Sequence, residues 1–174
     1  MSDTTSPEPG ATRPAKRSLA FWYGTFFGSG LFPVAPGTAG TVASLVLWAP
    51  VVLLDLPWWG RLLLAIFIFL TGVPAASACS KELGKEDPKE VVIDEVAGQG
   101  FALVFAPASF LYVGLGFVLF RLFDIWKPWP VRWADRSVHG GLGIMLDDVI
   151  AGIYAAGILF SCELFLPNNL AFFQ

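Results

Sequence analysis

The residues best suited to chemistry lie in the stretch from Phe120 to Asp148. This stretch holds four of the eleven basic residues, four of the fourteen acidic residues and the single histidine of the chain. Glycines and prolines interrupt it, and strongly apolar segments flank it on both sides. Charged side chains make a poor hydrophobic core, because an unpaired buried charge is costly. We therefore expect water or a ligand at this stretch, and most of an active site at a membrane surface.

Pairs of adjacent carboxylates add to this stretch. Asp94 and Glu95 stand near the start of one apolar segment, and Asp147 and Asp148 stand where another is expected to begin. Carboxylates near a bilayer are costly unless they are paired or bind cations. Several carboxylates with one histidine and no cysteine ligand suit a hard cation, most naturally Mg²⁺. The same pairs could instead serve only as partners of the helix dipole.

Basic residues near these carboxylates suit a phosphate group. Arg121 and Asp124 are spaced i,i+3 and so share a helix face, where they could also form a purely structural ion pair. Lysine and arginine are common partners of phosphate oxygens. The loop from Gly28 to Thr38 is expected to lead into a helix whose free amides form a further anion site, with Thr38 as its cap. Metal-assisted phosphoryl chemistry is indicated by the acidic cluster, the basic residues and the start of this helix together.

The composition places the chain in a membrane environment. Of its 174 residues, 55% are hydrophobic and 14% are charged, which is too apolar for an ordinary soluble domain. The net charge of −3 argues against nucleic acid as a partner. The length predicts a single domain, with residues 19–174 embedded in the membrane and residues 1–18 forming a disordered cytoplasmic tail.

Apolar runs predict an all-α, polytopic helical bundle with about five apolar helices. A short helix over 19–27 is expected to lie in the membrane interface. The five apolar helices are predicted at 41–56, 61–78, 91–106, 110–126 and 148–166.

The segment from Val91 to Trp126 is predicted to be a short hairpin that turns at Pro107-Ala108-Ser109. With this turn, ten of the eleven basic residues lie on one side of the membrane and only Arg61 lies on the other. Positive charge collects on the cytoplasmic side of membrane proteins. We therefore expect the carboxylates, the basic residues and the Gly28 to Thr38 loop to meet at one cytoplasmic face.

Three motifs, in order and spacing, resemble the phosphatidylglycerophosphatase A family of bacteria. They are GSGLFPVAPGTAG, VVIDEVAGQ and FRLFDIWKPWPVRWADRSVHGGLGIMLDDVIAG, and the resemblance runs from about Phe21 to Leu166. It implies a Mg²⁺-dependent lipid phosphatase of the bacterial inner membrane. Such an enzyme would convert phosphatidylglycerophosphate to phosphatidylglycerol and phosphate at the cytoplasmic face, with membrane lipids as its surroundings.

The residue roles that follow from this resemblance are hypotheses. The metal ligands are expected to be Asp94, Glu95, Asp124, Asp147 and Asp148. The substrate phosphate is expected to contact Gly37, Thr38, Arg121, Lys127, Arg132 and Arg136. The catalytic candidates are Glu95, Asp124, Lys127, Asp135 and His139, where Asp135 or His139 would protonate the leaving oxygen and either water or a carboxylate would attack phosphorus.

Two other functions stay open on the sequence. The first is another enzyme of the inner membrane that handles lipid phosphates. The second is a non-enzymatic transporter or scaffold, for which charges lining a path through the helices are expected. The charges here collect near helix ends, which favours chemistry at the membrane surface.

Overall fold

A computed structural model describes residues 17–165, and within them every regular element is helical. The elements, in chain order, are α1 (Leu19–Gly24), the short 3₁₀ helix η1 (Ser29–Leu31), α2 (Pro36–Leu53), α3 (Trp58–Leu83), α4 (Ile93–Ala102), α5 (Phe110–Trp126), α6 (Val131–Ser137) and α7 (Gly140–Phe165). The all-α prediction is confirmed for this part of the chain. The tail predicted for residues 1–18 lies, up to residue 16, outside the described residues.

Three of these helices, α2, α3 and α7, are long and apolar enough to cross a membrane by length and composition. Helix α4 has only 10 residues, so at about 1.5 Å per residue it spans roughly half of a bilayer's hydrocarbon core. Its short length is accommodated because it is covered by other helices. The first arm of the predicted hairpin is therefore a buried helix inside the bundle.

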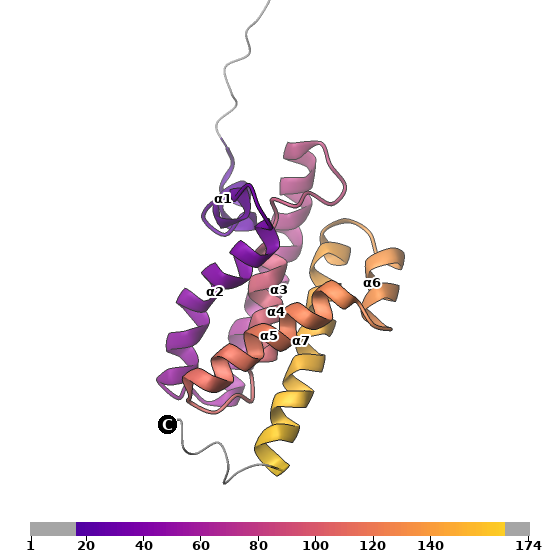
Figure 1. Ribbon diagram of the computed structural model, residues 1–174. Coiled ribbons are helices and arrows are strands. Elements are labelled where there is room, and N and C mark those ends of the chain that lie inside the picture. Colours follow the sequence, from indigo (N-terminus) through magenta and orange to yellow (C-terminus); the bar gives the residue numbers. More distant parts are fainter. Residues whose placement is uncertain (1–16, 166–174) are drawn as a thin grey trace, which may run out of the picture.

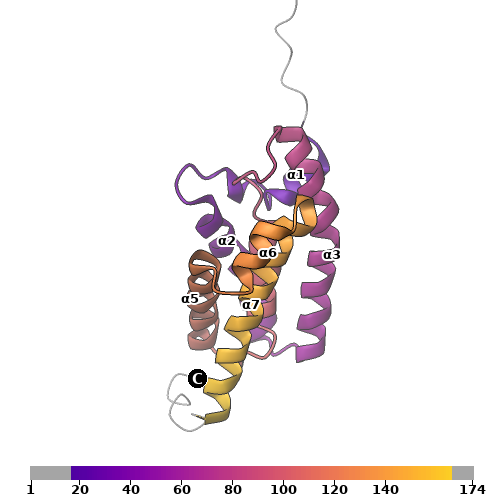
Figure 2. The same ribbon diagram turned by 90° about the vertical axis from the view of Figure 1, so that its right-hand side faces the viewer.

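Helix α4 occupies the centre of the bundle. It contacts α7, α3, α2 and α5, and eight of its ten residues are buried. Two of these neighbours, α3 and α7, are the long helices of the bundle, and both are labelled in Figures 1 and 2. Close approach to α7 depends on Gly98 and Gly152, because a Cβ added to Gly152 would lie 2.2 Å from the carbonyl oxygen of Gly98.

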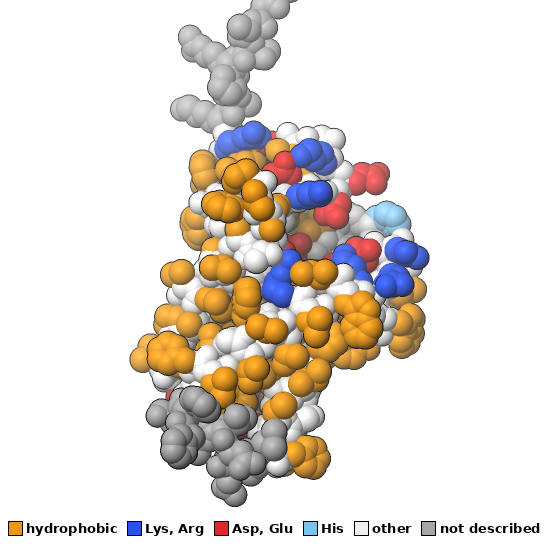
Figure 3. Space-filling model, in the orientation of Figure 1, with side chains coloured by type: hydrophobic (Ala, Val, Ile, Leu, Met, Phe, Trp, Pro, Cys, Tyr) orange, Lys and Arg blue, Asp and Glu red, His pale blue; other side chains and the backbone are white. Residues whose placement is uncertain are grey.

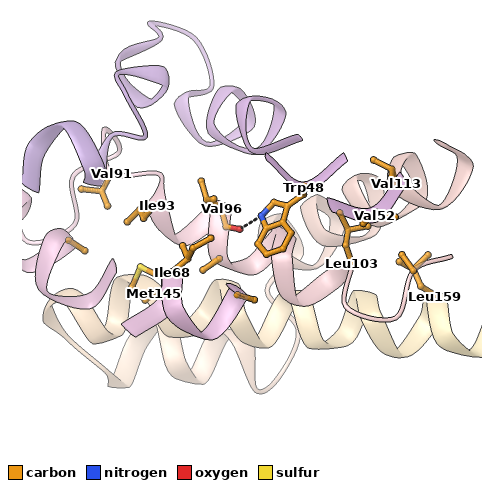
Figure 4. Close-up of a cluster of buried hydrophobic side chains, with 14 of the residues drawn as sticks. Trp48, Val52, Ile68, Val91, Ile93, Val96, Leu103, Val113, Met145 and Leu159 are labelled. Atoms are coloured by element: carbon orange, nitrogen blue, oxygen red, sulfur yellow. Dashed lines mark hydrogen bonds between the residues drawn. The ribbon is translucent and has the colours of Figure 1, made fainter. Parts of the chain in front are cut away.

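The largest buried side chain of the core is Trp48 of α2. Its indole N–H donates a hydrogen bond of 2.8 Å to the carbonyl oxygen of Val96 in α4 (Figure 4). The polar end of the indole is thus satisfied, as burial requires. Gly100 of α4 makes room for the ring, since a Cβ there would lie 2.2 Å from it. This contact fixes α2 against the central helix.

The predicted turn between α4 and α5 is present. Ser109 caps α5, since its hydroxyl accepts a hydrogen bond of 3.3 Å from the amide of Leu111. Arg121, near the end of α5, forms an ion pair with Glu95, near the start of α4. The two helices therefore run in opposite directions and bring their charged ends together. The bounds of α5 equal those predicted from the sequence.

Three helices begin earlier than predicted. Helix α3 begins at Trp58, not at residue 61. Helix α2 begins at Pro36, not at Thr41, with Pro36 in the favoured first position. Thr38 therefore lies inside the helix, and the prediction that it caps α2 is wrong. Helix α7 begins at Gly140, so Asp147 and Asp148 stand two turns inside it and not at its start. In addition, residues 131–137 form a helix, α6, that the sequence did not predict.

Charged side chains gather at one end of the molecule, as Figure 3 shows. This end contains the C-terminal turns of α3 and α5, the helix α6 and the first turns of α4 and α7. Arg61 lies at the other end, where it is buried and donates to the carbonyl oxygen of Ala106 and, at 3.1 Å, to Asp55. The described basic residues are thus divided between the ends as predicted.

Candidate active site

A cavity of about 750 Å³ opens at the charged end of the molecule. Its walls come from the C-terminal part of α3, the start of α4, the end of α5 and the first two turns of α7. Figure 3 shows acidic and basic side chains around a hollow at this end. Six acidic residues named by the sequence prediction line it: Asp94, Glu95, Asp124, Asp135, Asp147 and Asp148.

Three of these carboxylates form a compact triad. One oxygen from each of Asp124, Asp147 and Asp148 lies within 4.8 Å of the others. Asp147 and Asp148 are buried, with exposed fractions of 7% and 4%. Oδ2 of Asp148 is buried without a hydrogen-bond partner among the described residues. Three converging carboxylates, one with an unsatisfied buried oxygen, fit a bound cation, and an all-oxygen donor set suits a hard one.

The other two predicted ligands, Asp94 and Glu95, have partners of their own. Glu95 is buried, and it accepts hydrogen bonds from the Thr41 hydroxyl and from the Arg121 guanidinium. Asp94 accepts a hydrogen bond of 2.9 Å from the amide of Glu95. The structure therefore places all five predicted ligands at one cavity but brings only three of them together as a triad that could hold a metal ion.

Arg121 connects this acidic cluster to α2. It forms ion pairs with Glu95 and, at 2.6 Å, with Asp124, which confirms that Arg121 and Asp124 share a helix face. It also donates to the hydroxyls of Thr38 and Thr41, each at 3.4 Å. Arg121 does not itself line the cavity. It neutralises two carboxylates behind the cavity wall and thereby fixes their positions.

Gly37 and Thr38, predicted to bind phosphate, stand behind Glu95 and do not line the cavity. A Cβ added to Gly37 would lie 2.2 Å from Oε1 of Glu95. Only glycine therefore allows the first turn of α2 to approach the carboxylate this closely. The geometry gives both residues a positioning contact with the Glu95–Arg121 pair.

Lys127 reaches into the cavity from the end of α5. Its ammonium group donates to Asp135 and, at 2.8 Å, to Asp147 of the triad. Burial by itself would lower the pKa of Lys127, but the hydrogen bonds and charges of Asp135 and Asp147 outweigh it and raise this pKa above its ordinary value. Lys127 is therefore a permanent cation at the edge of the triad.

The remaining predicted residues divide between two places. Asp135 and His139 line the cavity near its mouth, and both are exposed. Arg132 and Arg136 do not line it. They lie on the exposed face of α6, beside a second hollow. The structure thus separates these two arginines from the carboxylates.

Several residues at the site were missed by the sequence prediction. Thr41 was predicted only as the start of a helix. Its hydroxyl contacts Glu95 and also forms a hydrogen bond of 3.0 Å to the carbonyl oxygen of Gly37. Ser77 of α3 accepts a hydrogen bond of 3.0 Å from the amide of Gly141. Lys81 and Lys85, counted in the sequence analysis only among the basic residues of the cytoplasmic side, also line the cavity. No spacing in the sequence connects these residues with the carboxylates.

Comparisons with known proteins agree with the motif resemblance. Residues 22–163 match the family model described as Phosphatidylglycerophosphatase A. The chain is 43% identical over 135 residues to phosphatidylglycerophosphatase A of Escherichia coli, covering 77% of each chain. It is 39% identical over 141 residues to the protein of the same name from Haemophilus influenzae, covering 79% of this chain and 84% of the relative.

A third relative carries a different name. A protein of Bacteroides thetaiotaomicron, named as a candidate phosphatidylinositol-3-phosphatase, is 41% identical over 139 residues, which cover 76% of this chain and 86% of the relative. No solved structure is significantly similar to the chain. The family model covers more than half of the chain, and the relatives are similar over most of their length. This chain belongs to the phosphatidylglycerophosphatase A family.

Proposed function

We propose that this chain is a Mg²⁺-dependent lipid phosphatase that hydrolyses phosphatidylglycerophosphate to phosphatidylglycerol and phosphate. The observation that carries this proposal is the triad of Asp124, Asp147 and Asp148, which faces a cavity in a member of the phosphatidylglycerophosphatase A family. An acidic triad beside a fixed lysine suits a phosphomonoester, because a cation held by the carboxylates would attract its charge. Mg²⁺ commonly binds through a few carboxylates and keeps positions for phosphate oxygens.

The residues of the cavity have separate tasks in this proposal. Asp124, Asp147 and Asp148 hold the cation, which would supply Lewis-acid stabilisation of phosphoryl charge. Lys127 contributes a positive charge at the edge of the triad and orients Asp147 through its hydrogen bond. Arg121 keeps Glu95 and Asp124 in place from behind the wall. Such fixed charges stabilise a transition state without reorganisation during the reaction.

The reaction transfers the phosphoryl group from the glycerol oxygen to water. A new bond forms between phosphorus and the attacking oxygen, the bond to the glycerol oxygen breaks, and this oxygen takes up a proton. Asp135 and His139 lie at the cavity mouth and are the candidates for donating that proton. The attacking group is either water, activated by a carboxylate such as Glu95, or a carboxylate that forms an acyl-phosphate, which water then hydrolyses.

The proposed location is the bacterial inner membrane, with the cavity facing the cytoplasm. Helices α2, α3 and α7 are the candidate spans, and the described basic residues other than Arg61 belong to the end that carries the cavity. Excess positive charge marks the cytoplasmic side. The acyl chains of the substrate would stay in the leaflet while its head group enters the cavity.

Phosphate release from phosphatidylglycerophosphate by the detergent-solubilised protein tests this proposal. We expect activity to be lost with EDTA and to return with Mg²⁺. Asp124→Asn, Asp147→Asn and Asp148→Asn should each lower kcat/KM by about 100-fold or more, because each weakens metal binding and transition-state stabilisation. Glu82→Gln is the matched control, since Glu82 is a carboxylate at the same end that lies outside the cavity.

Near-normal rates in all three asparagine variants would remove the metal site from the proposal. Activity that persists in EDTA would remove the cation itself. Absence of phosphate release from any phospholipid monoester would instead favour a transporter or a scaffold. These outcomes distinguish an error in the proposed enzymatic function from an error in the residues assigned to it.

A phosphoinositide monophosphate is the second candidate substrate, because the Bacteroides relative is named for that activity. It shares the essential chemistry, since it carries one phosphomonoester and one diester phosphate. The same assay with phosphatidylinositol 3-phosphate distinguishes the two. We expect kcat/KM to be higher for phosphatidylglycerophosphate, and the reverse order would reassign the substrate.

A further inference from the structure

A second hollow, of about 560 Å³, lies beside the carboxylate cavity. It is formed by α6 and the turn before it, and its lining is rich in tryptophan and arginine: Trp126, Lys127, Pro128, Trp129, Arg132, Trp133, Arg136 and Ser137. None of these lining residues is acidic. Among the described residues, neither Arg132 nor Arg136 forms an ion pair. The hollow therefore carries positive charge that the described protein does not neutralise.

The sequence of α6 explains this surface. Val131 and Ala134 are buried and hold the helix on the bundle, where α6 contacts α7. Arg132 and Arg136 are one turn apart and therefore share a face. Trp133 is 54% exposed on this helix, as it would be at a contact with lipid.

Exposed tryptophans place the hollow at the level of lipid head groups. The side chains of Trp126 and Trp129 are 63% and 79% exposed. Exposure of such large apolar rings is unfavourable in water, but it is the usual arrangement at a membrane interface. Arginines at this depth meet the phosphates of lipid head groups and bind them with charge-assisted hydrogen bonds. The chemistry of the hollow thus fits a phosphodiester, the group through which a glycerophospholipid carries its head-group alcohol at the interface.

Lys127 connects this hollow with the carboxylate cavity, because it lines both. Its ammonium group is bound to Asp147 of the triad and to Asp135. A head group with two phosphates on one glycerol unit could therefore reach both places at once. The diester phosphate would stay near the tryptophans, while the terminal phosphate would extend past Lys127 to the triad.

We propose that Arg132 and Arg136 bind the diester phosphate of the substrate lipid and thereby select lipids that carry both a diester and a terminal monoester phosphate. This inference rests on the proposed phosphatase function. It gives the two arginines a role in specificity, away from the phosphoryl group that is transferred. Phosphatidic acid, which has a single phosphate, cannot occupy both places and should gain nothing from them.

The test compares phosphatidylglycerophosphate with phosphatidic acid in mixed micelles of uncharged detergent. We expect Arg132→Gln and Arg136→Gln each to raise KM for phosphatidylglycerophosphate by about tenfold, because each removes a charge-assisted contact. Selectivity, the ratio of kcat/KM for the two lipids, should fall by the same factor, and Arg→Lys variants should recover part of it. Lys89→Gln, at an exposed position outside both hollows, is the matched control.

Lys81→Gln tests the part of the cavity wall formed by α3 as the site of the second phosphate. A fall in selectivity with Lys81→Gln but not with the arginine variants would overturn the inference. Equal losses on both lipids in the arginine variants would also overturn it, because they indicate general membrane binding. Failure of the unmodified protein to hydrolyse phosphatidylglycerophosphate would refute the proposed function as well, whereas normal activity with unchanged selectivity would refute this inference alone.

Discussion

The contact between Gly98 and Gly152 gives a sharp test of how the bundle positions its carboxylates. Gly98 follows Asp94 and Glu95 by one turn of α4, and Gly152 follows Asp148 by one turn of α7. A Cβ added to Gly152 would lie 2.2 Å from the Gly98 carbonyl oxygen, whereas ordinary contact begins at 3.4 Å. In Gly152→Ala the two helices must therefore separate by about 1.2 Å, the difference between these distances, one turn from the acidic cluster.

We expect Gly152→Ala to lower kcat/KM for phosphatidylglycerophosphate by about 100-fold, because displacements of about 1 Å can have effects of this size on catalysis. Stability should change less. Overpacking lowers the free energy of unfolding by about 1–3 kcal/mol, whereas the higher helix propensity of alanine over glycine raises it by about 1 kcal/mol. The expected product is a folded protein with a misplaced site. The Mg²⁺ concentration needed for half-maximal activity should also rise.

Gly157→Ala is the matched control for this experiment. Gly157 lies on the same helix, and a Cβ there would meet no heavy atom within 4 Å. It gains the same helix propensity without any change in helix separation. Initial rates of phosphate release and thermal unfolding followed by circular dichroism complete the assay. A folded Gly152→Ala protein with activity within about twofold of the original, or an equal loss in Gly157→Ala, would refute the reasoning.

Two further predictions follow from the charged residues. Arg121→Gln should lower the free energy of unfolding by about 3 kcal/mol, because it leaves the buried Glu95 carboxylate without its cation. The double variant Glu95→Gln, Arg121→Gln should recover part of this loss when unfolding is measured in detergent. A double variant whose loss of unfolding free energy equals the sum of the two single losses would contradict the pairing. The membrane orientation can be tested with single cysteines introduced into a variant without Cys79 and Cys162. Cysteines at positions 85 and 137 should react with a membrane-impermeant reagent from the cytoplasmic side, and a cysteine at position 108 should react only from the other side. Labelling of all three positions from one side would disprove the proposed orientation.

The sequence was sufficient to predict that the charged residues gather at one end of the molecule, because charge is conspicuous in an apolar chain. Carboxylates and basic residues are easily recognised between long hydrophobic runs. A charged side chain is tolerated in a bilayer only near a helix end or when it pairs with an opposite charge. The turn at Pro107 could be predicted for a similar reason, since it alone keeps most positive charge on one side. The motif resemblance then identified the family, which the comparisons confirm.

Helix boundaries were predicted less well where glycines cluster. Gly141 and Gly143 stand before the predicted start of the last helix at residue 148, yet both belong to α7. A Cβ on Gly141 would lie 2.1 Å from the carbonyl oxygen of Val73, and one on Gly40 in α2 would lie 2.5 Å from Val92. These glycines permit close packing inside helices. A single sequence does not distinguish that requirement from a turn, because the neighbouring helix is distant in the chain.

The sequence by itself determined which residue types are available, that the chain forms apolar helices, and that most of its acidic and basic residues belong to one face. Only the tertiary structure decided that Asp124, Asp147 and Asp148 form the triad while Glu95 pairs with Arg121 and Thr41. The tertiary structure also places Arg132 and Arg136 at a separate hollow, away from the carboxylates. The reason is that composition constrains burial and charge, whereas the partners of a carboxylate depend on distances between helices, which close contacts at single glycines set.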